Sequence, residues 1–363
     1  MTAPRACAAC LRRSWLLARL SGHLDVVRSR TRALLELEDR DLIDAVAVAA
    51  GAAGEIRGEW GRFDSHAYHA GCATAGVTPV CRCDPAYPRA LSSLAAGPAV
   101  LHVAGGFGRF RALAEQEPVA LVGARAASPY GLECARSLGR GLASAGVTVI
   151  SGMALGIDSA AHEGALHSGG PTLAVLAAAP ERAYPTVRRP LHRRILAAGA
   201  VVSELGPGVA VRRWMFPARN RIIAALSRMT VVVAARRGSG AMITAADALS
   251  LGRLVGAVPG PVSAPLSWGP HELLRTGARL VAEPADVLVA LFGADARRPA
   301  AARRRSAAPG LQPLLNAIAD GYDPPQAFAQ AGIDIAAGLA ALAALELEGY
   351  IRREPGGRFT IVG

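Results

Sequence analysis

The chain has 363 residues, of which 52% are hydrophobic and 5% aromatic, and this predicts a globular protein with more than one domain. It has no uncharged apolar stretch of about 20 residues and no signal-peptide pattern, so we expect no membrane span and a cytoplasmic location. The net charge of +12 comes entirely from arginine, and residues 119–292 hold 18 arginines against nine Asp and Glu residues, which favours an anionic partner, nucleic acid first.

Residues 1–75 alternate apolar and charged positions at helical spacing and predict a small helical domain. A zinc site could combine Cys7 and Cys10 of a C-x2-C pair with Cys81 and Cys83, and His69 could join it. Because C-x-C is not the usual second half of a structural zinc site, the sequence favours reduced thiols and no bound metal. Cys72 and Cys134 lie apart from both pairs.

After a connecting segment that starts near residue 84, short apolar runs alternate with helical stretches. The first runs are Val119–Gly123 and Thr148–Gly152, and TLAVLAA, AVVSEL, TVVVAA and LVGAVPG continue the series. Such alternation predicts a Rossmann-like α/β domain over residues 84–292, with a parallel sheet covered by helices on both faces. Ligands of such sheets bind beyond the carboxyl ends of the strands.

The C-terminal part has a different character. Residues 293–310 are basic, rich in alanine and contain prolines, which predicts a flexible linker. Residues 311–363 have the pattern helix, turn, helix, followed by a further helix and two short strands around Pro355-Gly356-Gly357. This order is typical of a winged helix.

The run FPARNRIIAAL, from Phe216 to Leu226, is the strongest candidate for a binding site. Arg219 and Arg221 flank Asn220 after a proline, and an apolar helical stretch and a strand follow. A guanidinium offers a planar fork of donors that matches a phosphate, and free N–H groups at a helix start add positive charge. The run therefore predicts an anion site.

Three other loops follow predicted strands and open helices. They contain Gly123 and Arg125; Ser151, Gly152 and Asp158; and Gly238, Ser239 and Gly240, with Thr244 one turn later. Each loop taken alone is also compatible with an ordinary strand-to-helix turn, but their shared position at one end of a sheet favours a single anion-binding groove. We find neither a nucleophile spaced with a base nor a Walker lysine, and we expect no enzyme activity and no cofactor.

Taken together, these loops resemble the DprA/Smf family of DNA-processing proteins. The resemblance is strong over residues 84–290 and rests on long motifs in a fixed order: VGARAASPYG, SGMALGIDSAAHEGAL, RAYP, SELGPG, FPARNRIIAALSR, GSGAMITAADAL and VPGPVSAPLSWGPHELLRTGA. Four positions depart from the family pattern: Ala124 replaces a more usual Ser, His271 a frequent Asn, and Arg236 and Arg237 more common Glu or Ala residues.

The resemblance implies a fold and a function. It implies an extended Rossmann-like domain that dimerises, a helical N-terminal domain of the SAM or helix-hairpin-helix type and a C-terminal winged helix. It also implies binding of single-stranded DNA (ssDNA) and the loading of RecA recombinase onto incoming DNA in natural transformation. By position, it matches Arg125, Phe216, Arg219, Asn220, Arg221, Ser239 and Gly240 to family motif positions. We expect ssDNA contacts from these residues and from Gly123, Ser151, Gly152, Arg188, Arg213, Gly238 and Thr244, whereas Asp158 can serve as an N-terminal helix stabiliser.

Alternatives remain open at this point. The same loops could hold a single mononucleotide in a sensor or a nucleotide-processing enzyme. A winged-helix transcription factor has only the last 50 or so residues in its favour. We also predict a homodimer interface at or near residues 262–281, where Leu266, Trp268 and Leu273 look exposed, although these side chains could equally cap the domain's own core.

Overall fold

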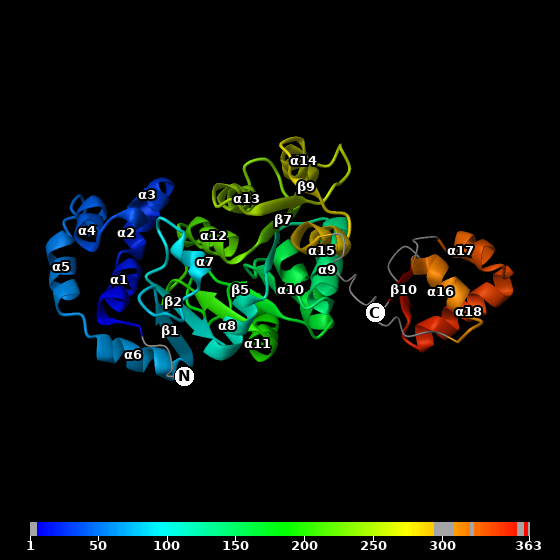
Figure 1. Ribbon diagram of the computed structural model, residues 1–363, viewed down its shortest axis with the longest axis horizontal. Helices are drawn as coiled ribbons and strands as arrows, with labels where there is room; N and C mark the ends of the chain where they lie inside the picture. Colours follow the sequence, from blue (N-terminus) through cyan, green and yellow to red (C-terminus); the bar gives the residue numbers. More distant parts are fainter. Residues whose placement is uncertain (1–5, 294–307, 320–322, 354–358, 362–363) are drawn as a thin grey trace. The chain divides into compact units, whose positions relative to one another are not determined.

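The computed structural model describes residues 6–293, 308–319, 323–353 and 359–361 (Figure 1). The chain forms two compact units, Met1–Arg298 and Pro299–Gly363. The predicted linker, residues 293–310, lies outside the described residues except at its two ends.

The first unit begins with helices that pack on the rest of the unit. Leu16, Leu42 and Ile56 of these helices share one hydrophobic core with Trp214 and Met215, so the N-terminal helices and the sheet region belong to the same compact unit. Local signals stabilise single helices: the Asp64 side chain, for example, accepts the free N–H groups at the start of the last one. The helices are α1 (Ala8–Arg19), α2 (Ser21–Val26), α3 (Thr31–Glu36), α4 (Asp39–Ala47), α5 (Ala53–Gly61) and α6 (Ser65–Thr74).

A nine-stranded sheet forms the centre of the first unit, in the order β1-β2-β6-β5-β4-β3-β7-β8-β9. The β1–β2 and β2–β6 pairs are antiparallel and every other pair is parallel, which confirms the predicted α/β class. The strands are β1 (Val77–Cys81), β2 (Val100–Ala104), β3 (Val119–Gly123), β4 (Val149–Ser151), β5 (Thr172–Val175), β6 (Ala200–Ser203), β7 (Met229–Ala234), β8 (Leu254–Ala257) and β9 (Arg279–Leu280).

Helices cover both faces of the sheet. Successive side chains of a strand point to opposite faces, and both faces of this sheet are apolar, so each needs a covering layer. In β3, Val119 and Leu121 pack with α9 (Pro129–Ser144), α10 (Ile157–His167) and α15 (Pro284–Phe292). Ala120 and Val122 belong to the core that contains α12 (Met215–Leu226) and α13 (Gly240–Ser250). The remaining helices of this unit are α7 (Arg89–Ser92), α8 (Phe107–Glu115), α11 (Arg189–Ala198) and α14 (Trp268–Arg275).

The strand order reverses between β3 and β7. From β3 the chain continues through β4, β5 and β6 toward one edge, and it then returns to β7 on the other side of β3. The loops after these two central strands therefore diverge, and such a reversal opens a crevice at the carboxyl ends of the strands.

The second unit contains three helices and a two-stranded antiparallel sheet around a core that includes Leu315, Phe328 and Leu342. This is the order of elements that the winged-helix prediction requires, and the assignment to that fold stays a prediction. Within the described part of the chain no single helix is long and apolar enough to cross a bilayer, although α17 and α18, bent by 105°, pass such a test as a pair. The elements are α16 (Gln312–Ala319), α17 (Pro324–Ala331), α18 (Ile335–Leu347), β10 (Ile351–Arg353) and β11 (Phe359–Ile361).

Candidate nucleic-acid interface

A cavity of about 310 Å³ lies beyond the carboxyl ends of the parallel strands. Its walls come from the segments that follow β3, β4, β5 and β6 and from the first turns of α12. The sequence separations between these segments are large, and only the parallel sheet brings them to one edge. Residues that matter for its chemistry are Arg125, Gly152, Leu155, Tyr184, Phe216 and Arg219.

Arg219 forms the floor of this cavity and is only 7% exposed. Its guanidinium donates hydrogen bonds to the carbonyl oxygens of Gly152, at 2.9 Å, and of Val175, and its Nε donates to Oδ1 of Asn220 at 3.2 Å. Burial lowers the pKa of Arg219 to about 10; the charge of Asp158 opposes this shift, and the nearby charge of Arg125 adds to it. Arg219 therefore stays protonated at neutral pH, and two positive charges meet at one place.

Gly152 is required by the position of Arg219. A Cβ atom on Gly152 would lie 2.1 Å from a guanidinium nitrogen of Arg219, so a larger residue would displace that side chain. The N–H group of Gly152 donates to Oδ2 of Asp158 at 3.1 Å. Burial raises the pKa of Asp158, and the charge of Arg219 acts in the opposite direction. The strand-to-helix loop after β4 thus holds the guanidinium, and contact of this loop with a phosphate stays a prediction.

Arg125 and two aromatic rings form the exposed part of the site. The guanidinium carbon of Arg125 lies 4.8 Å from the ring centroid of Phe216, and the Tyr184 ring lies 5.8 Å from the same ring. Arg125 is exposed, as is Tyr184, at 46% of its surface. This part of the site combines a donor fork for phosphate with flat apolar surfaces on which a base can stack.

The other two residues of the FPARNR run have structural partners. Arg221 is 5% exposed and pairs with Oε1 of Glu204 at 2.8 Å. Asn220 donates from Nδ2 to the carbonyl oxygen of Gly240 at 3.1 Å, which joins α12 to the start of α13. All three polar residues lie inside α12 and not before it, so the expected free N–H groups of a helix start do not accompany them.

Several residues predicted to contact DNA make hydrogen bonds or packing contacts within the fold. The Ser151 hydroxyl donates to the carbonyl oxygen of Leu121 at 2.6 Å, and the Thr244 hydroxyl donates to that of Gly240 at 3.3 Å. A Cβ on Gly123 would lie 2.6 Å from the Ile157 side chain, so this glycine serves helix-to-strand packing.

The loop after β7 remains a candidate for anion binding. Gly238 has a φ of +72° with open space around its Cβ position, and Ser239 is the N-cap of α13. Among the described atoms, the Ser239 hydroxyl has no hydrogen-bond partner. Arg188 and Arg213 do not line the cavity: Arg188 pairs with Glu163 at 3.2 Å, and Arg213 is exposed just before α12.

Two lining residues, Tyr184 and Leu155, were not predicted as site residues. Tyr184 lies in RAYP, one of the motifs that carry the resemblance to the DprA/Smf family, but the sequence predicted no role for its ring. Leu155 is 40% exposed in the glycine-containing loop after β4. An apolar side chain between two glycines at a strand end was the only available signal.

The region predicted to dimerise presents less apolar surface than expected. Leu273 is buried and Leu266 packs on the core beside α9, so both cap the unit's own interior. Trp268 is 50% exposed, and the Arg237 guanidinium carbon lies 5.5 Å from its ring centroid. Val262, at 85%, and Leu280, at 55%, complete the exposed apolar side chains of this region.

Fold and site together define a Rossmann-like α/β protein with a basic, partly aromatic crevice at the carboxyl edge of its sheet. The chain belongs to the family described as DNA recombination-mediator protein A, whose sequence profile matches residues 78–292. This match confirms the resemblance to the DprA/Smf proteins.

Individual relatives agree with this assignment. A Mycobacterium tuberculosis protein named as a DNA processing protein DprA is 47% identical over 188 residues, which is 50% of this chain and 48% of that protein. The chain thus spans about half the length of this relative. The X-ray structure of DNA processing protein A from Streptococcus pneumoniae aligns with a TM-score of 0.62 and 33% identity, over 77% of this chain and 95% of that one.

A second solved structure is that of DNA processing protein A from Helicobacter pylori. It aligns with a TM-score of 0.53 and 27% identity, over 59% of this chain and 95% of that one. That structure is described as showing a single-stranded DNA binding mode of the Helicobacter pylori protein.

Proposed function

We propose that this chain binds single-stranded DNA without sequence preference, protects it and loads RecA recombinase onto it, acting in the cytoplasm during natural transformation. The observation that carries the proposal is the pairing of Arg125 with Phe216 above the buried charge of Arg219. A phosphate needs a positive donor fork, and a base needs an aromatic face. Both are present within one crevice.

Each part of the crevice has a separate task. Arg125 donates to a backbone phosphate, and the rings of Phe216 and Tyr184 stack with a neighbouring base. Arg219 adds positive charge from below: carbonyl oxygens of Gly152 and Val175 occupy its Nη1 donors, and among the described residues no partner bonds to its Nη2. Arg221 positions α12 through its ion pair with Glu204 and makes no contact with the bound DNA strand in this proposal. The Ser239 loop offers a second phosphate position.

The proposed role is binding and not catalysis. Ser151 and Ser203 use their hydroxyls on backbone groups of Leu121 and Leu205. His162 is buried against the Thr172 hydroxyl at 2.7 Å. Among the described residues around the crevice, we find no nucleophile hydrogen-bonded to a base, which is the arrangement that covalent catalysis needs.

We also propose that two copies act together as a homodimer. One crevice offers few phosphate contacts, whereas two crevices on a continuous strand gain affinity by effective concentration. The exposed Trp268 with Val262 and Leu280 is the surface we assign to this contact. Light scattering that finds a monomer at micromolar concentration, with ssDNA affinity intact, would contradict this part of the proposal.

The test titrates the full chain with oligonucleotides of increasing length, with duplex DNA and with mononucleotides, by fluorescence anisotropy. The proposal expects affinity that rises with length and a strong preference for single strands. A second assay follows RecA filament assembly on strands coated with single-strand binding protein, with and without this chain. No acceleration of assembly, despite normal ssDNA binding, would remove the loading role and leave the binding role.

A mononucleotide sensor or nucleotide-processing enzyme is the alternative. The cavity volume of about 310 Å³ lies at the low end of the range of roughly 300–1,000 Å³ for small-molecule pockets. Tight mononucleotide binding with no dependence on oligonucleotide length would favour this alternative over the proposed function.

A further inference from the structure

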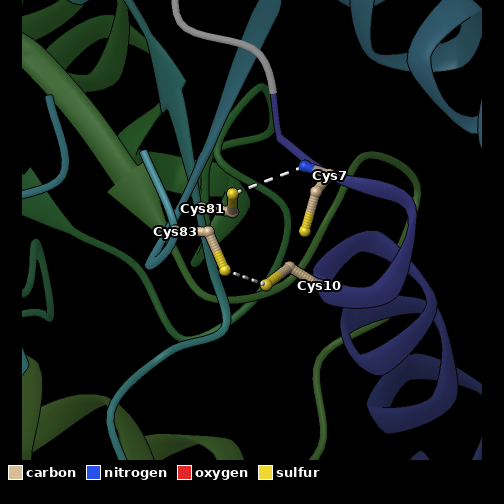
Figure 2. Close-up of side chains that lie close together, drawn as sticks. All are labelled: Cys7, Cys10, Cys81 and Cys83. Atoms are coloured by element: carbon tan, nitrogen blue, oxygen red, sulfur yellow. Dashed lines mark hydrogen bonds between the residues drawn. The ribbon is translucent and has the colours of Figure 1, made fainter. Parts of the chain in front are cut away.

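Four cysteine thiols from distant parts of the chain meet at one place in the first unit. Cys7 is the N-cap of α1 and Cys10 lies in its first turn, whereas Cys81 ends β1 and Cys83 follows two residues later. Their four sulfur atoms lie within 4.8 Å of one another, and Figure 2 shows them directed into a shared space. The first pair lies more than 70 residues before the second, so only the docking of α1 beside β1 brings them together.

The spacing of the sulfur atoms fits a metal centre and not a disulfide. The Sγ atoms of Cys10 and Cys83 are 3.7 Å apart, far beyond the S–S bond length of about 2.05 Å. In a tetrahedral zinc–thiolate centre with Zn–S bonds of about 2.3 Å, neighbouring sulfur atoms are about 3.8 Å apart. The Cys10–Cys83 separation matches this value, and the limit of 4.8 Å on the other pairs means that a tetrahedral centre would need them to close by about 1 Å at most.

The surroundings also suit bound thiolates. The Cys7 N–H group donates to Sγ of Cys81 at 3.4 Å, and such N–H···S bonds orient and stabilise metal-bound sulfur. Cys10 and Cys81 are buried, which excludes water from one side, and Cys83 is exposed, which leaves a route for the ion. His69 is not a fifth candidate, because its Nε2 lies 3.0 Å from the carbonyl oxygen of Ala6 and so helps to hold the segment before Cys7.

We propose that Cys7, Cys10, Cys81 and Cys83 bind one Zn²⁺ ion in a tetrahedral thiolate site that fastens α1 to strand β1. The C-x-C spacing that disfavoured zinc at the level of sequence is accommodated because Cys81 ends an edge strand and Cys83 lies in the turn after it. Four sulfur atoms in this geometry select zinc or a single iron among the common metals. We assign zinc, which has no redox chemistry and suits a structural site that offers no open position.

The ion would act as a structural clamp. It would close a loop of more than 70 residues, and it adjoins a small apolar cluster in which Leu11 of α1 packs with Ala99 and Val100 at β2. The free energy of metal binding then becomes free energy of folding for this contact. The site shares no residue with the crevice around Arg125, so the zinc proposal and the proposed DNA function can be tested independently of each other.

The test uses the full chain purified under reducing conditions without chelators, and it measures metal content by mass spectrometry. We expect one zinc per chain in the wild type and in Cys134→Ser, the control that removes a thiol outside the cluster. Cys83→Ser, at an exposed position, should lose most of the metal while still folding. Chelation should lower the thermal midpoint of the wild type and of Cys134→Ser, and it should have little effect on Cys83→Ser.

Cobalt supplies a second measurement that needs no variant. Reconstitution of the metal-free wild type with Co²⁺ should give the visible bands and sulfur-to-cobalt charge transfer of a tetrahedral thiolate centre. The proposal is overturned if the wild type contains no zinc and gives no such spectrum, or if Cys83→Ser retains stoichiometric zinc. A coloured, iron-containing wild-type protein, or Cys10–Cys83 disulfides in the reduced preparation, would overturn it as well.

Discussion

Replacing Arg125 by alanine tests the proposed crevice at its most accessible point. Arg125 is exposed, so its removal leaves the buried core intact. Arg219 is a poor choice for this purpose, because its loss would leave the carbonyl oxygens of Gly152 and Val175 without a buried donor. A fall in ssDNA affinity of Arg125→Ala would therefore report a lost contact and not a damaged fold.

The exposure of Arg125 sets the expected loss of ssDNA affinity in Arg125→Ala. A hydrogen bond to a charged group contributes about 1.5–3 kcal/mol, and the exposure of Arg125 places it near the lower limit, which corresponds to roughly a tenfold loss of affinity. Each phosphate neutralised on a single strand contributes about −0.7 to the slope of log K against log salt. The ratio of wild-type to Arg125→Ala affinity for ssDNA should therefore fall about 2.6-fold when salt rises from about 50 to about 200 mM.

The assay is anisotropy of a labelled oligonucleotide of mixed sequence across a salt series. Arg40→Ala, which removes an exposed arginine on α4, changes the net charge equally and should leave the slope unaltered. Arg125→Lys should recover the slope but only part of the affinity, because an ammonium lacks the planar donor fork. If Arg125→Ala and Arg40→Ala have the same slope and affinity as the wild type, Arg125 does not contact phosphate.

Three further perturbations test other parts of the molecule. Phe216→Ala should lose about 1–3 kcal/mol of ssDNA binding with an unchanged salt slope, since stacking releases no counterions, and a parallel loss of slope would contradict the stacking role. Gly152→Ala should lower both ssDNA affinity and the thermal midpoint by pushing Arg219 aside, whereas Gly71→Ala, on α6 with nothing near its Cβ position, should do neither. Burial lowers the pKa of His162 to about 3, below the unfolded value of about 6.5, so the unfolded state takes up the proton first and stability falls as pH drops through that window. Between pH 7.5 and 5.5 the wild type should lose about 1 kcal/mol more than His162→Gln in denaturant unfolding, and equal losses would show that His162 is not kept neutral.

Local sequence pattern was enough to predict the sheet and the edge at which its loops gather. Short apolar runs such as Val119–Gly123 alternate with helices, and this alternation predicts the parallel part of the sheet and the end where ligands bind, although not the antiparallel strands β1 and β2. The same logic placed Arg125 and Gly152 beside one cavity. These features depend on periodicity and chain direction, which are properties of neighbouring residues.

Features that depend on how distant elements dock were not predictable in this way. The four clustered cysteines meet only because α1 lies beside β1, and C-x-C spacing carries no information about that contact. Leu266 and Leu273 look exposed in a loop-rich segment, yet they pack on the core, since their neighbours come from other parts of the sheet region. A residue's burial is set by what covers it, and the covering elements are remote in sequence.

The arginines of the crevice show why net charge alone says little about where DNA binds. Arg219 and Arg221 are two residues apart, yet one lies beneath the cavity and the other pairs with Glu204, because positions two apart on a helix point in different directions. The guanidinium of Arg219 is buried and held by carbonyl oxygens, and the charge of Asp158 acts against its own. Arg125, which is exposed, can then make the direct phosphate contact. The proposed site combines one arginine inside the fold with another at its surface, and the sequence FPARNR contains only the first.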